Sequence, residues 1–344
     1  MLAAVLKELN KPLVIDEKPD PEPREGEVRI RIKASGLCNS DLHYMSGSSK
    51  VGKIPITLGH EIAGIVDRTG PGVNNIRVDD RVAVHYLLTC GKCRFCRECR
   101  ENLCAGAGML GKSADGGFAE YVVVPEQNAI PVPDGVSLEH AAIATDAVVT
   151  PYHAVSLAGA GEGAAVVIVG IGGLGAHAVQ LPGLFGAEKV IAVDISEPKL
   201  ELALGLGADY TVDASRENIT ERIMEITRGR GADAVIELTG SKKSIEEAVG
   251  CLAIGGRMVI VGICPEKIEI DSYNDILLKE AVLTGNRDHL ASEIREVLGI
   301  IEKKKLDLSR SISRRIKLGE INEGFRILRE REDNPVRIVV TEIS

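Results

Sequence analysis

The length, charge and composition of the chain exclude several classes of protein. Its 344 residues are enough for two domains with sizeable cores, and 41 basic against 50 acidic residues give a formal net charge of −9. That balance disfavours a general nucleic-acid or anionic-membrane surface, and no apolar run approaches the length of a bilayer span. The first residues, MLAAVLK, form too short an apolar stretch for a signal peptide, so we expect a cytoplasmic protein.

The first 35 residues predict β structure. Val28–Ala34 alternates apolar and basic side chains, which is the period of a half-exposed strand. A thiol, a hydroxyl and an imidazole then follow within six residues, at the expected start of a helix: Cys38, Ser40 and His43. Taken alone, this set fits a buried thiol and a surface histidine better than it fits a site.

The residues before the next expected strand, 62–66, change that interpretation. His60 could bind a metal together with Cys38, and Glu61 could support such a site or act as a reserve ligand. Gly59 suggests that another part of the backbone comes close at this point.

Cysteines crowd residues 90–104, which hold five of the eight in the chain. In a reducing compartment this crowding indicates metal binding before disulfides. A Cys-x2-Cys-x2-Cys-x7-Cys spacing suits a tetrahedral structural zinc, and its members are Cys90, Cys93, Cys96 and Cys104. Cys99 is left over by this count, so which four cysteines bind stays open.

Residues 138–157 are alanine-rich and predict a helix. Asp146 lies in this apolar segment, where an unpaired carboxylate would be costly, so a metal or a hydrogen-bond donor must satisfy it. A glycine-rich stretch at 158–163 then marks an expected domain boundary.

A dinucleotide-binding βαβ unit is predicted next. The apolar run Ala165–Val169 is followed by a G-x-G-x-x-G motif, a helix-compatible stretch and a second strand ending in an acid. We expect Gly170 to permit the tight turn, Gly172 to let a pyrophosphate approach the backbone, and Gly175 to let helix and strand pack closely. Asp194 can accept hydrogen bonds from the adenosine ribose and would repel a 2′-phosphate, which favours NAD over NADP. The alternative is a turn in an unrelated α/β sheet.

Strands and helices continue to alternate beyond this unit, which predicts a doubly wound parallel sheet. The expected helices span 197–206, 216–228, 242–252, 288–304 and 319–331, and the expected strands span 232–238, 257–261, 281–283 and 336–340. Pro182 should end or kink the first helix. Gly240, Gly262 and Ile263 lie at strand ends, where open α/β sheets bind ligands.

Taken together, these motifs resemble the zinc-containing medium-chain alcohol dehydrogenase family over essentially the whole chain. The resemblance rests on residues 36–43, 59–61, the four-cysteine loop, 115–121, and 170–175 with Asp194. It implies an α/β fold with a GroES-like, β-rich catalytic domain made of residues 1–150 and 287–344, with its structural-zinc loop at 90–104. A Rossmann domain at 151–286, a doubly wound parallel sheet, would bind NAD.

The resemblance also implies roles for individual residues. One catalytic zinc would be held by Cys38, His60 and Asp146 with Glu61 behind, and one structural zinc by the four-cysteine set. Many relatives carry a cysteine where Asp146 stands. Ser40 would accept the proton of the alcohol and His43 would pass it towards solvent.

The cofactor-binding residues that the motifs and the resemblance indicate are Gly170, Gly172, Gly173, Leu174, Gly175, Asp194, Lys199, Thr150, Gly240, Gly262, Ile263, Asn286, Arg287 and Arg337. Thr150 would contact the nicotinamide, and the two arginines would reach the pyrophosphate or its surroundings. By analogy, the substrate pocket would be lined by Tyr44, Tyr86, Met109 and Leu110.

The expected function is a zinc- and NAD-dependent dehydrogenase of a primary or secondary alcohol, or the corresponding carbonyl reductase. The family suggests a homotetramer or homodimer that acts on a small molecule, without nucleic-acid or membrane partners. A polyol, threonine or cyclic-alcohol dehydrogenase of the same family is the nearest alternative. A distant one is a non-catalytic dinucleotide sensor whose basic cysteine loop binds nucleic acid. The acidic net charge and the separate Cys38, His60 and Asp146 set argue against this sensor.

Overall fold

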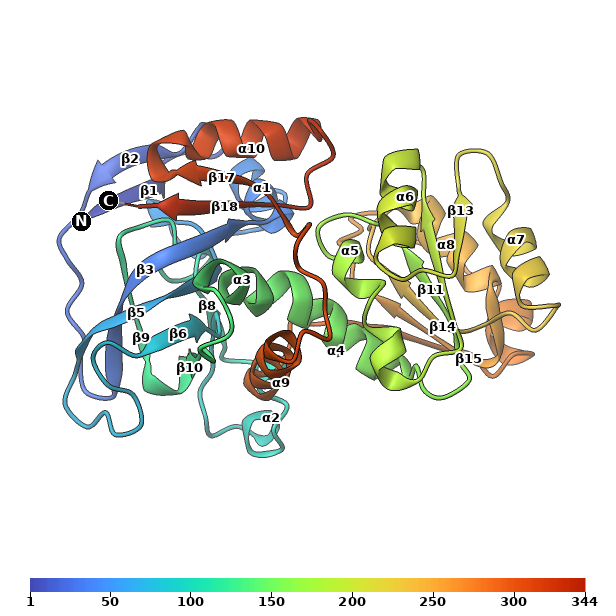
Figure 1. The fold of residues 1–344 in the computed structure, drawn as a ribbon, viewed down its shortest axis with the longest axis horizontal. Helices are drawn as coiled ribbons and strands as arrows, with labels where there is room; N and C mark the ends of the chain where they lie inside the picture. The colour runs from blue at the N-terminus through green and yellow to red at the C-terminus, as the bar shows by residue number, and fades with distance from the viewer. Residues whose placement is uncertain (344) are drawn as a thin grey trace. The chain divides into compact units, whose positions relative to one another are not determined.

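A computed structural model describes residues 1–343 and divides the chain into two compact units. The first contains residues 1–149 and the described residues from Leu290 onward, and the second contains Thr150–His289. The sequence analysis placed its divisions after residues 150 and 286. No helix within residues 1–343 combines the length and apolar character that crossing a bilayer requires. Figure 1 labels the α-helices and most of the strands of both units.

The first unit is built mainly of β structure. Its strands are β1 (Leu2–Leu6), β2 (Val14–Glu17), β3 (Glu27–Leu37), β4 (Ile56–Thr57), β5 (Glu61–Thr69), β6 (Arg81–Val84), β7 (Leu87–Leu88), β8 (Gly108–Met109), β9 (Tyr121–Pro125), β10 (Ala129–Pro131), β17 (Ile312–Lys317) and β18 (Arg337–Glu342). The main sheet runs β10-β6-β5-β3-β18-β17, with β9 also paired to β3, while β2-β1-β4 and β7-β8 form smaller sheets. The long strand β3 is therefore the centre of this unit.

The helices of the first unit are short and lie around this β core. They are α1 (Asn39–Ser46), α2 (Arg94–Arg97), η1 (Glu101–Leu103), η2 (Glu126–Asn128), α3 (Leu138–Ile143), the π-helix η3 (Ala144–Val148), α9 (Ala291–Glu302), η6 (Leu318–Glu320) and α10 (Ile321–Glu330). Figure 1 shows α10 alongside β17 and β18, which it contacts. Its buried Phe325 packs edge to face on Phe118, with ring centroids 5.8 Å apart. Apolar burial of this kind holds the last part of the chain against the first.

The second unit is a parallel sheet with intervening helices. Its elements are most of α4 (Val149–Ala158), then β11 (Ala165–Val169), α5 (Gly175–Ala178), η4 (Pro182–Phe185), β12 (Lys189–Asp194), α6 (Glu197–Gly205), β13 (Tyr210–Asp213), α7 (Ile219–Ile226), β14 (Ala232–Glu237), α8 (Lys242–Gly250), β15 (Leu252–Ile260), the π-helix η5 (Ser272–Leu277) and β16 (Val282–Gly285). The strand order is β13-β12-β11-β14-β15-β16, and all of these pairs are parallel. The expected doubly wound sheet is confirmed.

The strand order explains where the glycine motif lies. The neighbours of β11 are β12 on one side and β14 on the other, so the direction of winding changes at β11. Every residue of β11 is buried, as expected for a central strand of a parallel sheet covered on both faces. The glycine turn leaves the carboxyl end of this strand, the position where open α/β sheets bind ligands.

Several local expectations need correction. The helix after the glycine turn is only Gly175–Ala178, and a separate 3-10 turn begins at Pro182, so the expected break there is confirmed. Strand β15 starts at Leu252, five residues before its expected start, and β13 was not expected at all. The helical segment 138–158 is continuous but contains the π-helix η3.

Candidate functional site

The metal ligands expected at the catalytic site come from three separate elements of the first unit and meet at one point. Cys38 caps the N-terminus of α1, His60 and Glu61 lie at the start of β5, and Asp146 lies in η3. One ligand atom from each of the four lies within 4.8 Å of the others, and all four residues are buried. A thiol, an imidazole and carboxylates in one buried cluster form a donor set that fits zinc.

The pairing of β3 with β5 and β18 brings these residues together. Gly36 on β3 opposes Glu61 on β5, and Leu37 opposes Ile338 on β18. A Cβ at Gly36 would lie 2.0 Å from Oε2 of Glu61, so only glycine leaves room for this buried carboxylate. Cys38, directly after β3, therefore lies beside the start of β5.

The distances inside the cluster are short. Sγ of Cys38 lies 3.4 Å from Oδ2 of Asp146, and Nε2 of His60 lies 3.7 Å from the same oxygen. Burial acts to raise the pKa of Asp146, but His60 and Arg337 outweigh it and lower that pKa well below its usual range. Asp146 is therefore a carboxylate and able to act as an anionic ligand.

Arg337 supplies a buried positive charge to the same cluster. Its Nη2 lies 2.8 Å from Oε1 of Glu61 and 3.4 Å from Oδ2 of Asp146, and the residue is 2% exposed. Burial raises the pKa of Glu61 against the opposing charge of Arg337. The guanidinium of Arg337 thus lies against two buried carboxylates of the cluster, and its contact with a pyrophosphate or its surroundings stays a prediction.

Asp41 is a member of the site that the sequence analysis missed. It is fully buried, its Oδ2 accepts the backbone N–H of Cys38 at 3.1 Å, and its Oδ1 lies 3.4 Å from Nδ1 of His60. A carboxylate behind a metal-binding imidazole fixes which ring nitrogen faces the ion. The available signal was its position as the third helical residue after the cap, where an acid returns a hydrogen bond to the cap backbone.

The expected proton-transfer residues lie on α1. Oγ of Ser40 lies 3.7 Å from Sγ of Cys38, which places this hydroxyl next to the cluster. His43 lies one turn further along the helix, is half-buried, and has its Nδ1 3.1 Å from Oγ of Ser48. Both positions are compatible with moving a proton away from the cluster.

Two of the four expected pocket residues, Tyr44 and Tyr86, lie beside the His60 ring, and the other two contact these tyrosines. The ring of Tyr86 lies edge-on at 5.5 Å and the ring of Tyr44 at 6.4 Å, both centroid to centroid. The hydroxyl of Tyr44 points to the sulfur of Met109 at 3.6 Å, and burial raises the pKa of Tyr44. Leu110 is buried next to Met109 in the chain, and its backbone N–H bonds to Tyr86.

The cysteine loop forms a second cluster. One sulfur from each of Cys90, Cys93, Cys96 and Cys104 lies within 4.8 Å of the others, which suits a tetrahedral thiolate site. Backbone N–H groups of Lys92 and Cys93 lower the pKa of Cys90 to about 6, so a thiolate forms readily. Cys99 is exposed and lies outside this set, with a left-handed φ of 55°.

Glu101 ties the cysteine loop to a neighbouring helix. Its Oε1 accepts the backbone N–H of Ala291, the first residue of α9, at 2.9 Å. This bond satisfies one of the free N–H groups at the helix start and places a negative charge at the positive end of the helix.

The glycine turn of the second unit has the properties that the motif predicted. Gly170 has a left-handed φ of 94°, and a Cβ at Gly175 would lie 1.9 Å from the carbonyl oxygen of Gly170. A Cβ at Gly172 would meet nothing within 4 Å, so that side of the turn is open. Asp194 accepts the N–H of Ile171, inside the turn, at 2.7 Å. The turn and the acid are thus adjacent, as a dinucleotide site requires.

Other expected cofactor residues lie at strand ends of the same unit. A Cβ at Gly262 would lie 2.0 Å from the nitrogen of Gly240, so the segments that follow β14 and β15 close against each other there. Nδ2 of Asn286, after β16, donates to the carbonyl of Asp288 at 3.1 Å, and Oγ1 of Thr150 lies 3.3 Å from Nδ1 of His289.

The remaining cofactor candidates lie in the glycine turn, in helix α6 or at exposed positions. Gly173 and Leu174 complete the glycine turn, and Lys199 lies in the first turn of α6. Ile263 and Arg287 are exposed.

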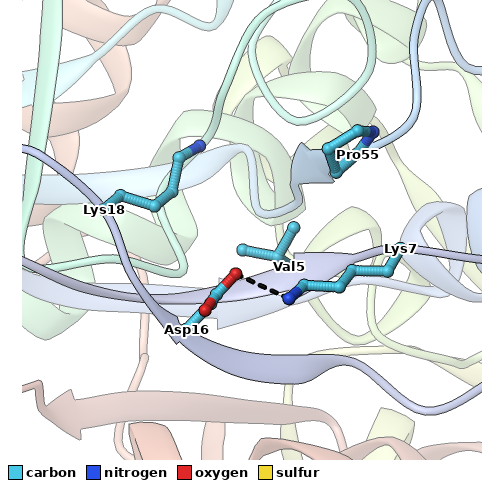
Figure 2. Close-up of a pocket in the computed structure, with 5 residues that line it drawn as sticks. All are labelled: Val5, Lys7, Asp16, Lys18 and Pro55. Atoms are coloured by element: carbon cyan, nitrogen blue, oxygen red, sulfur yellow. Dashed lines mark ion pairs between the residues drawn. The ribbon is translucent and has the colours of Figure 1, made fainter.

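A surface pocket of about 430 Å³ in the first unit is distinct from all of these residues. Figure 2 shows its lining, which is Val5, Lys7, Asp16, Lys18 and Pro55. Nζ of Lys7 pairs with Oδ2 of Asp16 at 2.7 Å across it. None of the residues expected in the site lines this pocket.

Comparison with known proteins agrees with the geometry. Residues 24–134 match the alcohol dehydrogenase GroES-like domain family, and residues 173–303 match the zinc-binding dehydrogenase family. An alcohol dehydrogenase of Geobacillus stearothermophilus is 37% identical over 332 residues, covering 94% of this chain and 98% of that protein. An L-threonine 3-dehydrogenase of Pyrococcus abyssi is 34% identical over 321 residues, 90% of each chain.

Solved structures give the same result. The crystal structure of a zinc-binding dehydrogenase from Sinorhizobium meliloti 1021 bound to NADP superposes with a TM-score of 0.91 at 31% sequence identity. The match covers 99% of this chain and 98% of that one. The two domain folds are therefore GroES-like and Rossmann, and the protein is an oxidoreductase of the dehydrogenase class. The chain belongs to the zinc-containing medium-chain dehydrogenase/reductase family.

Proposed function

We propose that the protein is a zinc- and NAD-dependent dehydrogenase that oxidises a primary or secondary alcohol, or reduces the corresponding aldehyde or ketone. The convergence of Cys38, His60 and Asp146 on one buried point carries this proposal. These three residues would hold a catalytic zinc, and Glu61 lies in the same cluster beside Arg337. The four-cysteine loop would hold a second, structural zinc.

The residues of the chain have separate tasks in this proposal. When bound, zinc supplies a Lewis acid that lowers the pKa of an alcohol, and NAD supplies the hydride acceptor. Ser40 receives the hydroxyl proton beside Cys38, and His43 moves that proton on towards solvent. Asp41 holds the His60 ring in its orientation, while the glycine turn and Asp194 bind the nucleotide.

The relatives of this chain are named for different substrates. The relatives include enzymes named for alcohol and for L-threonine, so threonine, polyols and cyclic alcohols form the alternative. A structural neighbour carries NADP, so both nucleotides belong in the test. We also propose that the protein assembles as a homotetramer or homodimer, which light scattering of the purified protein measures directly.

The test is turnover of the zinc-loaded protein with NAD and a panel of alcohols, followed as NADH absorbance. We expect oxidation of simple alcohols, and no turnover by Cys38→Ala, His60→Ala or Asp146→Ala despite intact folding. Cys264→Ala, which changes a half-buried cysteine of the second unit, is the matched control and should keep its activity. Near-normal activity of any of the three ligand variants contradicts the ligand assignment. If the protein oxidises only threonine or sugars, the proposed substrate class of simple alcohols is wrong and the alternative class takes its place.

The distant alternative predicts a different pattern. A dinucleotide sensor that binds nucleic acid would show salt-sensitive DNA binding and form no NADH from any alcohol. If both results are obtained, the sensor function replaces the proposed dehydrogenase activity.

A further inference from the structure

Lys112 lies near the candidate catalytic cluster, and no expectation from the sequence used it. Its Nζ is 5.4 Å from the centroid of the Tyr44 ring, and that ring lies 6.4 Å from the His60 ring. The Lys112 ammonium can therefore lie no farther from the centroid of the His60 ring than the sum of these two separations.

The backbone holds Lys112 in place. The segment 109–114 forms a tight turn in which Lys112 N–H donates to Met109 at 3.2 Å, and the carbonyl of Lys112 accepts Gly52 N–H at 2.7 Å. Met109 in turn receives the hydroxyl of Tyr44 at its sulfur. The lysine therefore starts from a fixed point next to residues that surround His60.

The charge of Lys112 is not neutralised within the described residues. The side chain is half-buried, and none of the carboxylates in residues 1–343 forms an ion pair with it. The nearest acid along the chain, Asp115, is already paired with Lys18 at 2.6 Å and has Lys53 at 3.9 Å. A half-buried ammonium without a counter-ion favours an anion at this position more strongly than a fully solvated one does.

The acids of the cluster cannot fill this role, because each already has a partner. Glu61 and Asp146 lie against Arg337, and Asp41 lies against His60 and the backbone of Cys38. Thiolate and carboxylate ligands would balance a divalent ion held there. Lys112 therefore has no ion-pair partner among the described acids of the cluster.

We propose that Lys112 is a specificity-determining residue that selects alcohols carrying an anionic group, a carboxylate or a phosphate, a few carbons from the reacting hydroxyl. The inference rests on the proposed dehydrogenase function and narrows its substrate class. The aromatic face of Tyr44 orients the ammonium, and the anion of the substrate takes the place of the missing counter-ion.

The test compares substrates that share a four-carbon skeleton and a secondary hydroxyl. These are 3-hydroxybutyrate, 3-hydroxybutyl phosphate and the neutral methyl 3-hydroxybutyrate. We expect Lys112→Met to lower kcat/KM for the preferred anionic substrate roughly tenfold, mainly through KM, relative to the neutral ester. Lys112→Arg should keep the preference, and Lys11→Met, which changes an exposed lysine elsewhere, should leave it unchanged. The carboxylate and phosphate arms show which anion is preferred.

The outcomes separate this inference from the function on which it rests. An anionic-to-neutral ratio of kcat/KM that is the same in Lys112→Met and the wild type overturns the role of Lys112 while leaving the dehydrogenase intact. If no alcohol is oxidised at all, calorimetric binding of 3-hydroxybutyrate and its methyl ester to the zinc-loaded protein decides the inference instead. Tighter binding of the anion that Lys112→Met abolishes supports it, and equal binding in both proteins overturns it.

Discussion

Oδ1 of Asp41 lies 3.4 Å from Nδ1 of His60, and the other oxygen of the same carboxylate accepts the backbone N–H of Cys38. One fully buried carboxylate therefore lies against two neighbouring candidate ligands. Burial alone would lower the pKa of His60, but Asp41, Asp146 and Cys38 raise it well above its ordinary value. The carboxylates thus favour positive charge at this place, and a divalent cation would supply it.

Asp41→Asn should weaken zinc binding while preserving the fold. Asparagine keeps an acceptor for the Cys38 N–H but lacks the charge behind the imidazole. Changes of this kind behind a metal ligand typically weaken metal affinity by about 10- to 100-fold. Competition with a chelator measures the effect, with the melting temperature as the check on folding. Asp16→Asn, on an exposed carboxylate, is the control. Zinc retention equal to that of the wild type would show that Asp41 does not orient His60.

Cys93→Ala should lower the stability of the first unit. The helix α2, inside the cysteine loop, has no buried residue, so the loop lacks an apolar core and depends on its metal. Cys99→Ala is a matched control, because Cys99 lies in the same loop but outside the cluster. We expect a lower melting temperature and the loss of one zinc per chain for Cys93→Ala only. Equal behaviour of the two variants contradicts the structural-zinc assignment.

Asp194→Gly should relax the preference for NAD. The carboxylate lies at the end of β12 and accepts the N–H of Ile171 in the glycine turn, where it would repel a 2′-phosphate. Without that charge, we expect the ratio of kcat/KM for NAD over NADP to fall roughly tenfold. Asp194→Asn separates the charge from the hydrogen bond and should shift the ratio in the same direction. Unchanged discrimination in both variants would rule out this role.

Glu237→Gln should change the pH dependence of stability. Burial raises the pKa of Glu237, although the hydroxyl and N–H of Thr239 and the N–H of Gly240 oppose it. Stability from this group is fully present below its unfolded pKa and is lost as pH rises through the higher folded pKa. The glutamine variant lacks this titration, so its stability relative to the wild type should improve as pH rises. Urea unfolding at pH values from below the ordinary pKa of glutamate upward measures the difference in unfolding free energy between variant and wild type. A difference that does not change with pH contradicts the prediction.

The sequence predicted best where one short segment encodes its own geometry. The G-x-G-x-x-G turn and the Cys-x2-Cys-x2-Cys loop are local, so residue spacing alone indicated the close packing at Gly175 and the four-sulfur cluster. Cys38 and His60 could be paired from their residue types, but Asp146 joined them only through the family resemblance, because it lies in a distant segment of the chain. Their roles as zinc ligands stay predictions.

What the sequence analysis missed depends on long-range pairing or on helix irregularity. The position of Arg337 follows from the register of β18 against β3, which contacts between the two ends of the chain decide. Apolar periodicity predicted a helix around Asp146 but carried no sign of the π-helix η3. Asp41 was missed because it is an ordinary helix-capping acid in sequence and a partner of His60 only after folding.

The hydrogen bond from Ala291 to Glu101 links the cysteine loop mechanically to helix α9. Helix α9 receives that bond at its first residue and packs against η3, which carries Asp146. Helix α9 therefore connects the cysteine loop to the π-helix that carries Asp146. A displacement of the cysteine loop would therefore be passed through α9 to the segment that carries Asp146.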